Sequence, residues 1–90
     1  MYYVYVLFSK KDKRLYTGYT NDLKRRLTEH KSGKNIATRN RLPVLLIYYE
    51  AYIESSDAVR RERYLKGGKG GAELKVQLRD IFREVEYRHR

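Results

Sequence analysis

One set of residues in this sequence could act together on a phosphodiester: Tyr5, Tyr16, Gly18, Arg26 and Glu62. Phenols can hydrogen-bond a phosphate or orient a water molecule, and an arginine can bind two phosphate oxygens through its forked donors. A glutamate can hold one divalent metal ion. The question is therefore which secondary-structure elements would bring these side chains together.

The two tyrosines fall in a predicted β-hairpin. Residues 2–8 and 14–19 are rich in aromatic and β-branched types, and a polar segment separates them. A loop over 9–12 would place Tyr5 opposite Tyr16, and a slip of two residues would still leave both on one face. Gly18 lies on that face and offers a bare spot for another backbone or a ligand. Alternatively, the tyrosines are ordinary strand residues without a chemical role.

A helix is expected next, capped by Thr20 or Asn21 and ending near Ser32, with Gly33 as its stop. At 100° per residue, one narrow stripe of the helix contains Leu23, Leu27 and His30. Arg26 borders this stripe, so it is the arginine that can turn inward. His30 itself is expected either to assist proton transfer or simply to be packed and hydrogen-bonded.

Residues 34–43 are interpreted as a basic loop, and the apolar run at 44–52 as a strand in the centre of the sheet. A second helix follows, capped by Ser55 or Ser56 and ended by glycines at 67–68. Glu62 falls within the apolar arc of this helix. A carboxylate in that position needs a metal, a partner or a cleft, and an ion pair with Lys66 is the simplest alternative.

The glycine-rich segment at 66–71 is predicted to be a flexible break. A third helix should follow from about Ala72. Its apolar positions are Leu74, Leu78, Ile81, Phe82 and Val85. We expect this stripe to pack across the sheet, with dimerisation as the alternative to a monomer. The expected organisation is a nuclease-like domain over 1–69 and a helical extension over 70–90 that packs on it.

Net charge indicates a polyanionic partner. The chain has 21 Lys and Arg residues against 11 Asp and Glu residues, giving a formal charge of +10. Nucleic acid is the expected ligand, with solubility or attraction to anionic lipid as alternatives. The basic residues expected to contact phosphates are Lys34, Arg39, Arg41, Arg60, Arg61, Arg63 and Lys66. The sequence shows neither an apolar run of about 20 residues nor a signal-peptide pattern, so a cytoplasmic location is expected.

Several other chemistries lack their sequence signatures. Without cysteine there can be no disulfide and no thiolate zinc site. The KGGKGG segment lacks the spacing of a phosphate-binding loop, and neither an HExxH metal motif nor a nucleophile elbow is present. Any metal must therefore bind oxygen or imidazole ligands.

Two short motifs resemble those of the GIY-YIG nuclease superfamily. They are Tyr3-Val4-Tyr5 and Tyr16-Thr17-Gly18, whose tyrosines Tyr5 and Tyr16 are eleven residues apart. The helix at 21–30 is similar to that superfamily's arginine-bearing helix, and the helix at 57–66 to its glutamate-bearing helix. The likeness covers about residues 2–69 and is closest to small stand-alone bacterial and archaeal members. Tyr3 and Thr17 depart from the motifs, but neither position carries a reacting group.

The resemblance implies an α/β (α+β) fold with a central three-stranded antiparallel sheet flanked by helices. It implies a DNA endonuclease, acting in repair or processing, that uses Mg²⁺ or Mn²⁺. The implied catalytic residues are Tyr5, Tyr16, Gly18, Arg26, His30 and Glu62, with Glu62 as the metal ligand. DNA is expected as substrate more than RNA. The alternative is a non-catalytic nucleic-acid-binding module or an adaptor that keeps the same fold.

Overall fold

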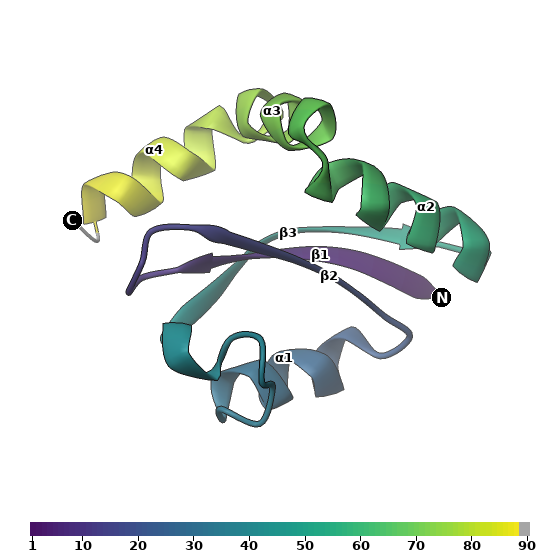
Figure 1. Cartoon of the computed structure of the whole chain (residues 1–90), viewed down its shortest axis with the longest axis horizontal. Helices are drawn as coiled ribbons and strands as arrows, with labels where there is room; N and C mark the ends of the chain where they lie inside the picture. The colour runs from purple at the N-terminus through teal and green to yellow at the C-terminus, as the bar shows by residue number, and fades with distance from the viewer. Residues whose placement is uncertain (89–90) are drawn as a thin grey trace.

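The structure, a computed structural model, describes residues 1–88 and the side chains of residues 1–85. Three antiparallel strands form one sheet: β1 (Tyr2–Ser9), β2 (Leu15–Thr20) and β3 (Val44–Tyr52). Helix α1 (Leu23–Lys31) covers one face of the sheet (Figure 1). The other three helices cover the opposite face: α2 (Ser55–Lys66), α3 (Gly68–Gln77) and α4 (Arg79–Arg88). The predicted α+β fold, with a three-stranded antiparallel sheet flanked by helices, is confirmed.

Strand β1, rather than β3, occupies the centre of the sheet, because the strand order is β2-β1-β3. The prediction of a central β3 was therefore wrong. Every residue from Val4 to Phe8 is at most 1% exposed, whereas Tyr49 of β3 is 52% exposed. The tyrosines of β3 suit an edge strand, because one part of a tyrosine side chain can pack on the protein while its hydroxyl meets water.

The two faces of β1 belong to two separate cores because its side chains alternate. Val4 and Val6 pack with Ala58, Leu65 and Leu74 of the helices above the sheet. On the other face, Tyr5 and Leu7 form a cluster with Val44, against which Leu23 and Leu27 of α1 pack. Residues of the proposed site that come from β1 and α1 therefore share one face.

The β1–β2 register differs by two residues from the predicted one. Tyr5 pairs with Gly18 and Leu7 with Tyr16. The loop is longer than expected, and Lys13 adopts a positive φ of 62° within it. Because the difference is an even number, Tyr5 and Tyr16 remain diagonal neighbours on one face, which was the second arrangement expected from the sequence.

The N-cap of α1 lies one residue after Asn21, the later of the two predicted caps. Asp22 is its N-cap, and the Asp22 carboxylate accepts a hydrogen bond from the backbone N–H of Arg25. The predicted stripe is confirmed, because His30 is fully buried and Leu23 and Leu27 are half-buried. Gly33 ends this region with a φ of 79°, as predicted.

Gly67 ends α2 as predicted, but residues 68–71 of the glycine-rich segment are helical, so the prediction that the segment is a flexible break was wrong. Gly70 lies within α3 at the contact with α2, and a Cβ atom there would lie 2.0 Å from the backbone oxygen of Tyr64. Small residues are thus needed because the two helices approach so closely. The predicted third helix is two helices, α3 and α4, which meet at Leu78 without a glycine or proline to mark the break.

The first part of the C-terminal apolar stripe packs onto the rest of the domain. Leu74 and Val85 are each 2% exposed, and Leu78 packs against the cluster formed by Val4 and Val6. The division at residue 69 stays a prediction, and α3 runs across it. Among the residues described, no helix combines the length and the apolar character needed to cross a lipid bilayer.

Candidate active site

A buried hydrogen-bonded chain links β1 to α1. The Tyr5 hydroxyl lies 2.7 Å from Nε2 of His30, and Nδ1 of the same ring lies 2.7 Å from Oγ1 of Thr38. All three side chains are fully buried. When the phenol donates to Nε2, the Nδ1–H group donates to Thr38. A neutral histidine can therefore make both hydrogen bonds at once. Thr38 is a site residue that sequence reasoning missed.

Tyr16 completes an aromatic cluster around this histidine. The centroids of the Tyr16 and His30 rings are 5.2 Å apart, and those of the Tyr5 and Tyr16 rings are 6.3 Å apart. Unlike Tyr5, Tyr16 is only half-buried. It is therefore the phenol of this cluster that a ligand in solution can reach.

Gly18 makes room for Tyr5 rather than for a ligand. A Cβ atom at position 18 would lie 2.4 Å from both the Cζ and the hydroxyl oxygen of Tyr5. The phenol of Tyr5 thus covers the bare spot that the sequence predicted would receive another backbone or a ligand. The motif glycine and the first motif tyrosine form one packing unit across the strand pair.

Burial controls the protonation of this chain. It raises the pKa of Tyr5 above the ordinary value of 10, the nearby Tyr16 phenol adds to the effect, and the Arg26 guanidinium opposes it through its charge and hydrogen bonding. Burial also lowers the pKa of His30 below its ordinary value of 6.5, and the charge of Arg26 acts in the same direction. At pH 7, Tyr5 is therefore protonated and His30 is neutral.

Arg26 turns toward this cluster, as its position beside the α1 stripe predicted. Its charge acts on both Tyr5 and His30. The Nε atom of Arg26 is buried and lies 3.2 Å from Oε1 of Glu29, but in an ion pair without hydrogen-bond geometry. The Arg26 side chain as a whole is 31% exposed, so part of its guanidinium meets solvent and can bind further acceptors, such as phosphate oxygens.

Glu62 lies on α2, which covers the face of the sheet opposite to α1. Its side chain is 18% exposed, and Oε2 lies 3.1 Å from Nζ of Lys66, so the alternative ion pair is present. Lys66 also lines a hollow with Tyr16 and Thr17 of β2. The pair lies within α2 and only its lysine lines the hollow beside Tyr16, and no hydrogen bond or ion pair within the described residues joins Glu62 to Tyr5 or Arg26.

Two of the basic residues proposed for phosphate binding are tied into the fold. Arg41 forms a two-point ion pair with Asp12, with Nε 2.6 Å from Oδ2, and this bond lowers the pKa of Asp12 well below its usual range. Arg61, expected to be exposed, makes three hydrogen bonds to Glu50, with side-chain exposures of 31% and 13%. Both arginines hold elements together, and the expectation that Arg61 is exposed was wrong. Phosphate binding by these two residues stays a prediction.

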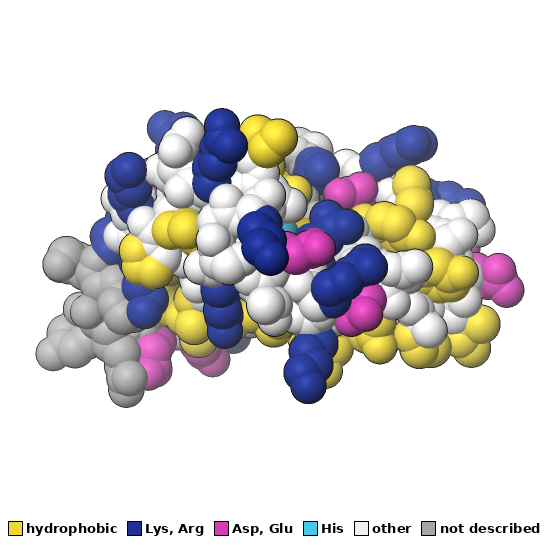
Figure 2. Space-filling view, turned by 90° about the horizontal axis from the view of Figure 1, so that it is seen from below, with side chains coloured by type: hydrophobic (Ala, Val, Ile, Leu, Met, Phe, Trp, Pro, Cys, Tyr) yellow, Lys and Arg dark blue, Asp and Glu magenta, His cyan; other side chains and the backbone are white. Residues whose placement is uncertain are grey.

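The other basic residues proposed for phosphate binding are exposed: Lys34, Arg39, Arg60, Arg63 and Lys66. Arg60 pairs with Asp57, and Lys66 pairs with Glu62 at the surface. The exposed pair of Arg60 and Asp57 contributes only about 0–1 kcal/mol, so it opposes a phosphate contact of Arg60 weakly. The α1 face of the molecule carries many Lys and Arg side chains with acidic ones interspersed (Figure 2).

Glu50 is the centre of a polar cluster that sequence reasoning missed. It accepts hydrogen bonds from Tyr48, Tyr52 and Arg61. Burial acts to raise the pKa of Glu50, but the bonds from Arg61 and the two phenols outweigh it and lower the pKa below its ordinary value. An acid within an apolar strand was the available signal, since a half-buried carboxylate needs such partners.

A metal ion would depend on few protein ligands here. No three His, Cys, Asp or Glu side chains come together as a metal cage anywhere in the described part of the chain. Glu62 is a single carboxylate with access to solvent. This donor set fits Mg²⁺ or Mn²⁺, because Mg²⁺ commonly binds one or two carboxylates and completes its shell with water and substrate phosphate.

Comparison with known proteins gives the family of the chain. A UPF0213 protein of Streptococcus pyogenes serotype M5 (strain Manfredo) is 50% identical over 68 residues, covering 74% of this chain and 73% of that protein. The same values hold for a UPF0213 protein of serotype M3 (strain ATCC BAA-595 / MGAS315). The solution NMR structure of the UPF0213 protein BH0048 from Bacillus halodurans is 37% identical with a TM-score of 0.53, covering 86% of this chain and 85% of that one.

The family model described as the GIY-YIG catalytic domain matches residues 1–73, which contain both tyrosine motifs, the arginine of α1 and the glutamate of α2. With most of its length matched in this way, the chain belongs to the GIY-YIG family, a family of nucleases.

Proposed function

We propose that this protein is a metal-dependent endonuclease that hydrolyses phosphodiester bonds in DNA during repair or processing. The observation that carries the proposal is the assembly of Tyr5, Tyr16, Arg26 and His30 on one face of the sheet, in a chain of the GIY-YIG family. Cytoplasmic location and the preference for DNA over RNA stay predictions.

The half-buried residues of the cluster, Arg26 and Tyr16, are assigned to substrate binding. Arg26 binds the phosphate oxygens through the part of its guanidinium that is exposed. Tyr16 hydrogen-bonds the scissile phosphate or the attacking water, because it is the accessible phenol. Gly18 acts indirectly, since it allows Tyr5 to reach His30.

The buried chain is assigned to positioning rather than to direct attack. A phenol can act as a base only when its pKa falls toward neutrality, and burial moves the pKa of Tyr5 the opposite way. The Tyr5–His30–Thr38 chain instead fixes the ring against which Tyr16 packs. Neutral His30 accepts a hydrogen bond from the Tyr5 hydroxyl at 2.7 Å, which keeps both side chains in place.

Glu62 is proposed to hold one Mg²⁺ or Mn²⁺ jointly with the substrate, which requires its ion pair with Lys66 to open. When bound, the metal would polarise the phosphate and stabilise the leaving oxygen. Hydrolysis adds the hydroxyl of water to phosphorus and its proton to the leaving oxygen. Lys66, once released, is free to contact a neighbouring phosphate.

A cleavage assay tests this function. Labelled duplex, flap, junction and single-stranded DNA, together with RNA, are incubated with Mg²⁺, Mn²⁺ or EDTA. Glu62→Gln and Arg26→Lys should each lower metal-dependent cleavage at least about 100-fold while retaining most DNA binding. The matched controls are Glu54→Gln, at the N-cap of α2, and Arg25→Lys on α1, both exposed, and both should cut like the parent.

Cleavage by the Glu62 and Arg26 variants at the parental rate would show that the site is wrong. Binding without cleavage of any substrate by the parent would favour the non-catalytic module.

A further inference from the structure

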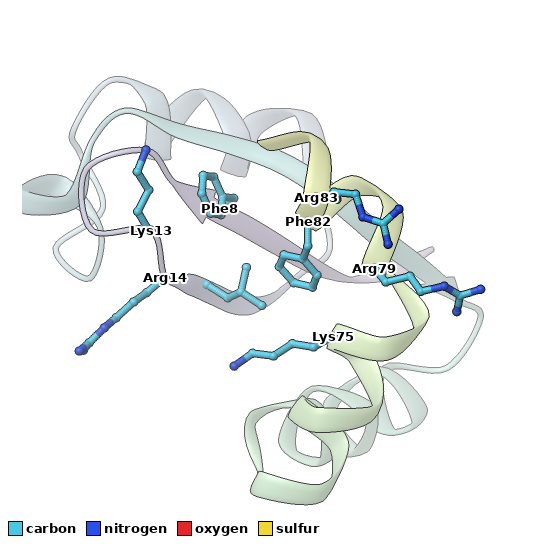
Figure 3. Close-up of a pocket in the computed structure, with 8 residues that line it drawn as sticks. Phe8, Lys13, Arg14, Lys75, Arg79, Phe82 and Arg83 are labelled. Carbon is cyan, nitrogen blue, oxygen red and sulfur yellow. The ribbon is translucent and has the colours of Figure 1, made fainter. Parts of the chain in front are cut away.

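A large basic hollow lies outside the tyrosine cluster, between the end of the β1–β2 hairpin and helices α3 and α4 (Figure 3). It has a volume of about 720 Å³. Two phenylalanines, Phe8 and Phe82, and Leu15 provide its apolar surface. Its basic residues are Lys13, Arg14, Lys75, Arg79 and Arg83.

The charge around this hollow is of one sign. All five basic side chains are exposed, and none of the residues that line the hollow is acidic. Figure 3 shows Lys75 reaching from α3 toward the hairpin, while Arg79 and Arg83 extend outward from α4. Charges spread along a rim in this way suit an extended polyanion, whereas a single phosphate needs donors that converge on one point.

Aromatic rings lie within this basic rim. Phe8 is 1% exposed and forms part of the floor, with Nζ of Lys13 6.0 Å from the centre of its ring. Phe82 is half-buried, so one part of its ring remains accessible. An accessible aromatic ring among basic side chains is an arrangement by which proteins bind single-stranded nucleic acid, where bases stack on the ring and cations follow the backbone.

This hollow adjoins a second one at the edge of the candidate active site. A second hollow, of about 330 Å³, is lined by Tyr16 and Lys66. Leu15 and Lys75 line both hollows. A strand bound along Phe82 and Lys75 would therefore lead to Tyr16 and to Lys66, the ion-pair partner of Glu62.

We propose that the Phe82 hollow binds an unpaired nucleic-acid segment next to the cleaved phosphodiester, so that the substrate is a duplex with a single-stranded tail or branch. The hollow favours unpaired nucleotides because the bases of a duplex are stacked on one another and cannot reach a ring at the bottom of a hollow. The placement relative to the cleavage point rests on the proposed function, whereas binding in the hollow does not.

Fluorescence anisotropy in EDTA tests the binding, since cleavage cannot interfere. The probes are a blunt duplex, the same duplex with a ten-nucleotide tail, and the tail alone. Phe82→Leu keeps an apolar side chain without the aromatic face, and Lys75→Gln removes one charge. Two variants serve as controls. Phe82→Tyr keeps the aromatic ring, and Lys31→Gln removes one charge from an exposed residue of α1, on the face of the sheet opposite to α3 and α4. Thermal unfolding checks that each variant is folded.

We expect the tail to strengthen binding to the parent by about 5-fold or more, the range that stacking of one or more bases supplies. Phe82→Leu and Lys75→Gln should each remove most of this gain, and Phe82→Tyr and Lys31→Gln should retain it. Equal affinity for tailed and blunt duplexes overturns the proposal, as does a gain that survives in both Phe82→Leu and Lys75→Gln. Binding of phosphatidylglycerol vesicles that depends on Phe82 and Lys75, without tail-dependent DNA binding, identifies a lipid site and overturns it too.

Cleavage in Mn²⁺ separates this proposal from the previous one. If the parent cuts the tailed duplex near its branch point and Glu62→Gln binds equally well without cutting, both proposals are supported. Tail-dependent binding without cleavage by the parent supports the hollow and refutes the nuclease. Cleavage that is independent of the tail supports the nuclease and refutes the placement of the hollow beside the cleaved bond.

Discussion

Tyr5 lies directly opposite Gly18 in the antiparallel β1–β2 pair, and its phenol occupies the space that any side chain at position 18 would need. The same phenol reaches His30 with its hydroxyl. The glycine of the second motif is therefore required by the tyrosine of the first, and through it by the position of the histidine. A family pattern of separate short motifs corresponds here to one three-dimensional contact.

This contact predicts the effect of Gly18→Ala. The added methyl group would lie 2.4 Å from the Tyr5 ring, so the ring or the strand must shift. We expect a loss of about 1–3 kcal/mol in the free energy of unfolding and at least about a 10-fold loss of cleavage, as Tyr5 moves away from His30. Urea denaturation and the cleavage assay measure the two effects. Gly68→Ala is the control, since no atom lies within 4 Å of a Cβ there; parental stability of Gly18→Ala would contradict the account.

The elements that could be predicted from the sequence are those specified by local periodicity. The shared face of Tyr5 and Tyr16 follows from strand alternation for any even register, and the burial of His30 follows from its spacing from Leu27 and Leu23. Neither requires knowledge of the rest of the chain. The cluster of Tyr5, Tyr16 and His30 could therefore be predicted from the sequence alone.

The elements that were not predicted depend on contacts between distant residues. Arg41 binds Asp12, 29 positions away in the sequence, and Arg61 binds Glu50, 11 positions away. The local sequence pattern therefore could not indicate these ion pairs. The position of β3 at the edge depends on which strands pair. The helical structure at Gly70 depends on the approach of Tyr64, against the intrinsic preference of glycine.

Substituting each tyrosine by phenylalanine should separate chemistry from packing. Tyr5→Phe leaves Nε2 of buried His30 without its partner, which should cost about 1–3 kcal/mol in the free energy of unfolding. Tyr16→Phe removes a half-buried hydroxyl and should cost less than about 1 kcal/mol, yet lower cleavage at least about 100-fold. Chemical denaturation and single-turnover cleavage measure the two quantities. If Tyr16→Phe cuts at the parental rate, the accessible phenol has no part in catalysis.

Acid should destabilise the protein through His30. Because burial lowers the pKa of His30, the histidine stays neutral in the folded chain when it protonates in the unfolded chain, below about pH 6.5. The unfolded state then binds more protons, so stability is complete above this pH and falls as the pH decreases, by at most about 1.4 kcal/mol per pH unit. Urea denaturation between about pH 7.5 and 5 should show this slope in the parent and a flatter one in His30→Gln, and equal slopes would count against it.

The ion pair between Arg61 and Glu50 should matter for stability, in contrast to that of its neighbour Arg60. Arg61→Ala leaves the half-buried Glu50 carboxylate without its charged partner, and we expect a loss of about 2 kcal/mol in the free energy of unfolding. Arg60→Ala removes a pair whose arginine is 74% exposed, and should change stability by less than about 1 kcal/mol. Urea denaturation at low and high salt measures both, and only the small Arg60 effect should vanish at high salt. Equal stability of the two variants would mean that Arg61 has no structural role, and Arg61 would then be expected to contact DNA phosphates instead.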